Sequence, residues 1–152
     1  MKDCKAKFGA NLYVDTLDDS PEIITRITGV EYSEILIRGT QFYSPWSNKA
    51  IPNKKNERNF WIYRTPEIRD TKEWEFENGI ASLLNVLNTQ KEKFRELFST
   101  YSNSYMLAYL SVHDFHVSFL LTDKIYSDLA YYGLNIKFDL YSLPEDADAD
   151  SA

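Results

Sequence analysis

The segment from Glu77 to Tyr101 constrains the fold of this chain most, because it is the only long stretch whose apolar residues keep a helical period. Its large side chains recur at steps of three, four and seven residues and so share one stripe of an α-helix: Ile80, Leu83, Leu84, Leu87, Phe94, Leu97, Phe98 and Tyr101. A helix with one apolar stripe must bury it against another element, and strand-like segments lie on both sides. We therefore expect one long helix packed against a β-sheet.

Alternating residues and helix-end signals divide the chain before this helix. Alternation of apolar and polar residues over residues 5–15 predicts a half-buried strand. A short helix should follow, because Ser20 can cap it, Pro21 fits its first position and Gly29 can end it. Residues 30–38 contain an apolar β-branched run and predict the next strand.

The middle of the chain contains three successive segments that differ in composition. Residues 40–57 carry prolines, asparagines and lysines among their aromatic residues, and we expect a long, locally basic irregular loop. Residues 58–65 are apolar on both faces, as in a central strand. Residues 67–78 form an acidic connector that leads into the long helix, either as a short strand or as its approach.

Beyond the long helix the pattern returns to strands. Residues 104–113 and 115–121 are both strand-like and almost directly connected, which predicts a hairpin. A second short helix, capped by Thr122 and ended by Gly133, should precede a last strand over residues 135–141.

These segments predict an α+β fold with a mostly antiparallel sheet packed against one long helix and two short helices. The expected order is βαββαββαβ, and the two halves on either side of the long helix look alike, which suggests a duplication. Residues 1–143 should form a single domain, and residues 144–152 a disordered acidic tail.

Composition limits the classes of function. The net charge of −6 disfavours nucleic acid as a partner, because binding to a phosphate backbone needs clustered Lys and Arg, but it suits a basic protein. Cys4 is the single cysteine and cannot form an intrachain disulfide. No run approaches the roughly 18 apolar residues of a membrane span. We expect a cytoplasmic protein without a membrane segment, and the absence of nucleotide or nucleophile motifs predicts no cofactor.

Four landmarks then point to a known pattern. They are Ser20-Pro21-Glu22-Ile23-Ile24 with Gly29; Ile37-Arg38-Gly39; Asn59-Phe60-Trp61-Ile62-Tyr63 before a Leu-rich helix; and Leu134-Asn135-Ile136-Lys137-Phe138-Asp139-Leu140-Tyr141. Over nearly its whole length apart from the tail, the chain resembles the bacterial family catalogued as domain of unknown function 4279. Small acidic proteins of such families are often encoded beside bacterial toxins. The resemblance therefore implies an immunity protein, which neutralises a cognate toxin by binding it.

The two histidines are the candidates for catalysis. His113 and His116 flank Asp114 and Phe115 within four positions, and imidazole is a common general base and metal ligand. A zinc site would need a third protein ligand, which this segment does not supply by itself. An enzyme or metal-dependent hydrolase that uses these histidines is the alternative to a binding protein.

Two segments are candidates for partner binding. The acidic connector places carboxylates around a tryptophan and could hold a basic toxin domain; its candidate residues are Glu67, Asp70, Glu73, Trp74 and Glu75. The aromatic loop offers residue types that are favoured at protein interfaces; its candidates are Phe42, Tyr43 and Trp46. A second alternative is a structural or regulatory homodimer that uses an exposed sheet edge and tyrosines.

Overall fold

The computed structural model describes residues 6–45, 47–70, 76–112 and 119–142. Helices are α1 (Ile23–Thr28), α2 (Glu77–Asn88), α3 (Lys91–Thr100) and α4 (Asp123–Tyr132). Strands are β1 (Ala6–Asp15), β2 (Glu34–Leu36), β3 (Gln41–Tyr43), β4 (Ala50–Lys55), β5 (Phe60–Arg64), β6 (Ile68–Asp70), β7 (Tyr105–Val112) and β8 (Asn135–Ser142). The expected α+β class with a mostly antiparallel sheet is confirmed.

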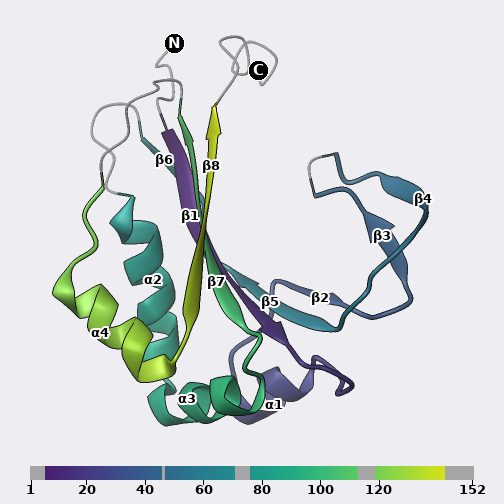
Figure 1. Cartoon of the computed structure of the whole chain (residues 1–152), viewed down its shortest axis with the longest axis horizontal. Coiled ribbons are helices and arrows are strands. Elements are labelled where there is room, and N and C mark those ends of the chain that lie inside the picture. The colour runs from purple at the N-terminus through teal and green to yellow at the C-terminus, as the bar shows by residue number, and fades with distance from the viewer. Residues whose placement is uncertain (1–5, 46, 71–75, 113–118, 143–152) are drawn as a thin grey trace.

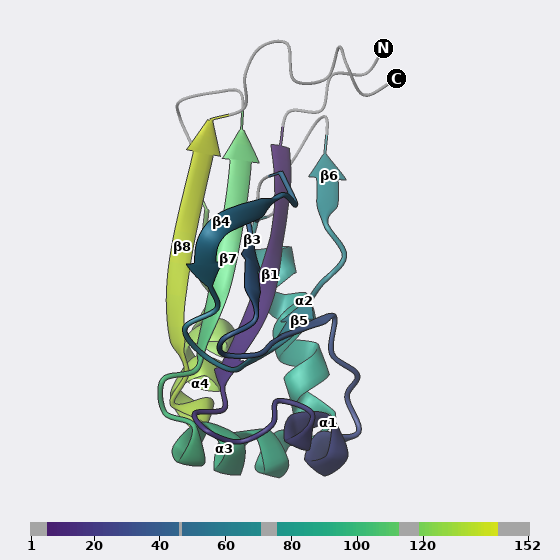
Figure 2. The same cartoon turned by 90° about the vertical axis from the view of Figure 1, so that its right-hand side faces the viewer.

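One main sheet and one separate hairpin hold these strands. The main sheet has the order β2-β5-β1-β7-β8, with β6 beside the start of β1 (Figure 2). Its pairs are antiparallel except for β7 and β8. These two are parallel because the connection through α4 returns the chain to the end of the sheet at which β7 began. Strands β3 and β4 pair only with each other within the described chain.

The core lies between one face of the main sheet and the helices. Helices α2 and α4 cover that face, while α1 and α3 lie across one end of the sheet (Figure 1). Alternate residues of β1 and β7 point into the core, including Phe8, Leu12 and Met106, which are buried. Helix α2 packs very closely on β1, because a Cβ added to Gly79 would lie 3.1 Å from Cα of Gly9.

The expected single long helix is wrong, because the segment forms two helices. Helix α2 ends at Asn88 and α3 begins at Lys91, with Gln90 in a non-helical conformation between them (φ −135°, ψ 50°). The apolar stripe survives the break, since Leu87 and Phe94 are both fully buried. The break lets α3 turn across the end of the sheet and cover it (Figure 1).

The expected loop over residues 40–57 and the strand over residues 30–38 are also corrected. The first contains β3 and β4, which project from the domain as a hairpin (Figure 1). The second shortens to the three residues of β2. All of β4 is exposed, so its side chains show no apolar alternation, and Pro52 is tolerated because β4 is an edge strand.

The predicted hairpin after the helices is wrong as well. Strand β7 forms as expected, but its neighbours are β1 and β8, and residues 119–121 contain no strand. Residues 115–118 and the predicted tail at 144–152 lie outside the described chain. The order βαββαββαβ and the two similar halves are therefore not found in the described residues.

The predicted helix ends are correct at three of four positions. Gly29 and Gly133 end α1 and α4 in left-handed conformations, and the Thr122 side chain accepts a hydrogen bond from the Ile125 N–H. Ser20 is not the cap of α1. That helix begins after Glu22 without a side-chain cap, and only the Ser20 carbonyl accepts the Ile23 N–H.

No helix within the described part of the chain is both long and apolar enough to cross a membrane.

Candidate functional site

The face of the main sheet opposite the core carries aromatic side chains, and no helix of the described chain covers it. Tyr13 of β1 and Tyr105 of β7 are cross-strand partners and stack with ring centroids 5.1 Å apart and planes 8° apart. Phe60 of β5 packs edge-on against both rings. Burial raises the pKa of Tyr13 and Tyr105 above the ordinary value, which further favours their neutral hydroxyls. We call this surface the open face.

Tyr109 and Tyr141 extend the open face toward the other end of the sheet. The Tyr109 ring lies over Gly9, where a Cβ would come within 2.8 Å of its hydroxyl oxygen. Its hydroxyl donates to Oε2 of Glu67 at 3.3 Å, and burial together with this carboxylate raises its pKa to about 12. The Tyr141 hydroxyl donates to Oδ2 of Asp139 at 3.1 Å.

The β3–β4 hairpin stands opposite the open face and provides a second aromatic wall. Lys54 of β4 places its Nζ 4.2 Å from the centre of the Phe42 ring on β3, a cation–π contact. Hydrogen bonds fix the base of the hairpin: the Gly39 N–H donates to the Asn56 carbonyl at 2.8 Å, and the Asn56 N–H donates to the Thr40 carbonyl at 2.9 Å.

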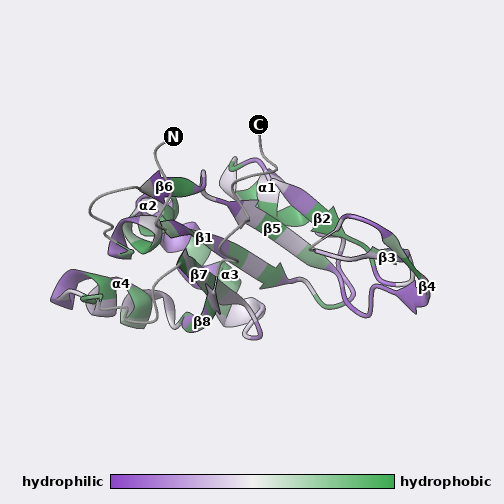
Figure 3. Cartoon of the chain, turned by 90° about the horizontal axis from the view of Figure 1, so that it is seen from above, coloured by the Kyte–Doolittle hydropathy of each residue, from purple (hydrophilic) through white to green (hydrophobic). Residues whose placement is uncertain are grey.

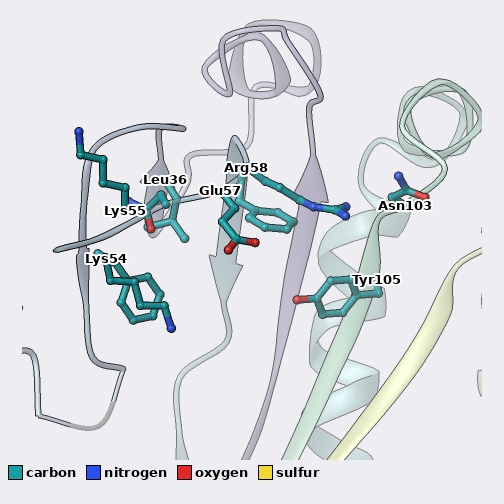
Figure 4. A pocket seen from close by; sticks show the side chains of 10 residues that line it. Leu36, Lys54, Lys55, Glu57, Arg58, Asn103 and Tyr105 are labelled. Atoms are coloured by element: carbon teal, nitrogen blue, oxygen red, sulfur yellow. The ribbon is translucent and has the colours of Figure 1, made fainter. Parts of the chain in front are cut away.

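Two cavities lie between the hairpin and the main sheet, and we call them together the hairpin groove. The first, of about 430 Å³, is lined by Phe42 and Lys54 from the hairpin and by Arg58, Phe60 and Tyr105 from the sheet side. In Figure 4 the carboxylate of Glu57 and the hydroxyl of Tyr105 point toward the same space. Aromatic walls and convergent polar groups are typical of a binding site.

The second cavity, of about 380 Å³, continues the groove along the hairpin. It shares Leu36, Phe42 and Asn56 with the first and adds Tyr13 and Tyr43, among others. The Tyr43 side chain is 55% exposed. The hairpin groove is therefore one continuous surface on which a partner would contact β3, β4 and β5 together.

Ion pairs hold the arginines around the hairpin groove. Arg58 donates to Asp15 at 2.8 Å, and the Asp15 side chain is only 3% exposed, so this pair anchors the guanidinium beside the first cavity. Arg64 pairs with Glu34 at 2.7 Å at the second cavity. Lys54 and Lys55 make no ion pair within the described residues, and Lys54 lies over the Phe42 ring instead.

The groove provides binding chemistry, and the described residues that line it include neither cysteine nor histidine. In the described ranges, no three His, Cys, Asp or Glu side chains gather as metal ligands would. The predicted catalytic residues His113 and His116 lie outside those ranges, and their role stays a prediction.

The structure separates the two predicted binding segments. Phe42 and Tyr43 line the hairpin groove. Glu67 lies on the open face and lines neither cavity; it accepts hydrogen bonds from Tyr109 and from Arg69, whose Nε is 3.0 Å away. Asp70 ends β6. The other candidates, Trp46, Glu73, Trp74 and Glu75, lie outside the described residues.

Sequence reasoning did not identify the sheet residues of the groove. Tyr13, Phe60 and Tyr105 belong to strands that were predicted correctly, and alternation places each on the face opposite its buried neighbours. The missing information was which face the helices leave uncovered. Arg58 had a weaker signal, a charge directly before a central strand.

The sequence matches one protein family over most of its length. A family model described as Domain of unknown function (DUF4279) matches residues 6–143. No curated protein and no solved structure gives a significant match to the chain.

Proposed function

Because this chain belongs to the DUF4279 family, whose function is unknown, we propose a function from its groove: a non-enzymatic protein-binding domain that holds its partner between the β3–β4 hairpin and the open face. The observation that carries the proposal is the hairpin groove itself. It is a continuous surface whose lining includes the aromatic side chains Tyr13, Phe42, Tyr43, Phe60 and Tyr105. We further propose that the partner is a bacterial toxin and that the chain acts in the cytoplasm as its immunity protein.

The residue types of the groove support a protein ligand. Tyrosine and arginine are enriched among the residues that dominate binding energy at protein interfaces, and Tyr13, Tyr43, Tyr105, Arg58 and Arg64 all line it. The Tyr13 and Tyr105 rings are already stacked on each other, so a partner that covers them should cost little side-chain entropy.

The shape of the hairpin supports the same function. It projects from the domain and leaves both of its own edges without a strand partner in the described chain (Figure 1). Its base is fixed by the backbone hydrogen bonds of Gly39 and Asn56, while all of β4 is exposed. Such an arm can contact a partner on one side while the sheet contacts it on the other.

Charge supports a toxin as the class of partner. The chain carries a net charge of −6, which would steer it toward a basic protein at long range. Toxins that act on nucleic acids need clustered cations to bind phosphate, and a basic toxin of this kind would be attracted to an acidic chain.

Co-purification from the native host tests the proposal. The tagged chain should retain one partner, and co-expression should protect cells from a toxin encoded by a neighbouring gene. A Phe42→Ala/Tyr43→Ala variant should weaken binding of the retained partner by about tenfold or more and reduce protection. The matched control is Tyr126→Ala, which removes a side chain that is 58% exposed on α4, away from the groove. Equal binding by both variants would contradict a role for the groove.

A further inference from the structure

Among the residues that the structure describes, strand β8 has no partner on its outer side and so leaves a long free edge on the main sheet. It pairs with β7 along all eight of its residues and is the last strand of the sheet order on that side. Figures 2 and 3 both place it at the border of the domain, with no labelled element beyond it. Strands β2 and β6 also lie at an edge but have three residues each, which is a common protection against further pairing.

The side chains of β8 are self-complementary around Phe138. If two copies pair antiparallel with Phe138 opposite itself, residues 135–141 of one strand face residues 141–135 of the other. Lys137 then faces Asp139 of the second copy, and Ile136 faces Leu140. Asn135 faces Tyr141. Opposite charges in directly opposed positions stabilise a pair of strands, and like charges destabilise it.

We infer that two copies of this chain pair through antiparallel β8 strands, so that their main sheets join into one continuous sheet. The pairing is isologous: the two-fold axis passes between the two Phe138 residues, so every other contact occurs twice. This inference does not depend on the proposed toxin binding, because β8 lines neither cavity of the hairpin groove.

Burial supports β8 as an interface. The Leu140 side chain is 60% exposed although it lies on the face of the sheet that packs against helices, next to the half-buried Phe138 and Ile136. In the paired strands it would pack beside Ile136 of the second copy. Lys137 is exposed, so its charge is available to a carboxylate across the strand.

Charge reversal tests the register. Wild-type protein should sediment at twice the 17.8 kDa chain mass and dissociate on dilution. Lys137→Asp places two aspartates opposite each other at both symmetric positions, and Asp139→Lys places two lysines there; each variant alone should be monomeric. An equimolar mixture should dimerise again, because every opposed pair is then Asp and Lys. Lys93→Asp, which reverses an exposed charge on α3, is the control and should remain dimeric.

A disulfide test probes the same register without placing a lysine beside the Tyr141 hydroxyl, which donates to Asp139. Lys137→Cys mixed with Asp139→Cys, both in a Cys4→Ser background, should form a crosslinked dimer, because directly opposed strand residues lie within disulfide reach. Lys137→Cys alone should not crosslink efficiently. A monomeric wild type at every concentration, dimeric charge-reversal variants, or a mixture that stays monomeric would each overturn the inference.

Discussion

Gly9 lies between a tyrosine ring on the open face and helix α2 on the core face. A Cβ at Gly9 would come within 2.8 Å of the Tyr109 hydroxyl oxygen, and a Cβ at Gly79 would come within 3.1 Å of Gly9 itself. Glycine therefore allows both layers to approach the strand here. The same close approach positions Tyr109 for its hydrogen bond to Glu67.

Gly9→Ala should destabilise the fold by about 1–3 kcal/mol, because the added methyl group displaces the Tyr109 ring. Chemical denaturation of Gly9→Ala, Tyr109→Ala and the double variant measures the coupling between the two positions. We expect the loss caused by Gly9→Ala to shrink when Tyr109 is already truncated. Additive losses would show that the methyl group meets no obstacle from the ring.

Tyr101 gives the stability a predictable dependence on alkaline pH. Its hydroxyl donates to Oδ2 of Asp19 at 2.6 Å, and burial together with this carboxylate raises its pKa from 10.0 to about 12. The neutral hydroxyl is thus favoured in the folded state. Its contribution is complete below pH 10 and is lost as the pH rises from 10 to 12.

Tyr101→Phe should therefore cost roughly 1–3 kcal/mol below pH 10, because it removes a hydrogen bond to a charged group. The difference in unfolding free energy between wild type and variant should narrow between pH 10 and pH 12. Urea denaturation at a series of pH values measures it. A difference that stays constant over this range would contradict the raised pKa.

At the scale of elements, the sequence predicted the helices and strands that bury one of their faces in the core. Strand β1 alternates apolar and mostly polar residues and β7 is rich in Tyr, Leu and Val, so their bounds were found almost to the residue. The break between α2 and α3 was missed because six consecutive non-apolar residues, 88–93, separate Leu87 from Phe94. Such a gap fits one helix or two equally well.

The β3–β4 hairpin was missed for a different reason. A strand is recognised from sequence by the contrast between a buried and a solvated face, and β4 has no buried face. Its residues are held by pairing with β3 and by the hydrogen bonds at its base. The aromatic residues of this segment were identified as binding candidates, but the sheet wall opposite them could not be predicted.

Replacement of residues 41–55 by a two-residue Asn-Gly turn should leave the domain folded. Thr40 and Asn56 are already joined, with the Asn56 N–H donating to the Thr40 carbonyl at 2.9 Å, so a short turn can close the gap. The far-ultraviolet circular dichroism should retain the helical signal, and the variant should lose binding to the co-purified partner. Loss of cooperative unfolding would show that the hairpin is part of the core.

At the scale of the whole molecule, helices cover one face of the main sheet and leave the other to aromatic side chains and the hairpin groove (Figure 1). The sequence predicted the fold class because burial of one stripe against a sheet is a local pattern. It could not predict the groove, since that depends on β3–β4 and β5 meeting across the open face. Partner binding at the groove and pairing at β8 use different surfaces and can occur together.

Hydrogen exchange of the chain, free and bound to the partner that co-purifies with it, tests the groove most directly. The proposed function predicts slower exchange of amides in β3 and β4 on binding, with no change in α2 and α4 on the opposite side. Slower exchange confined to α2 and α4, with β3 and β4 unchanged, would contradict it.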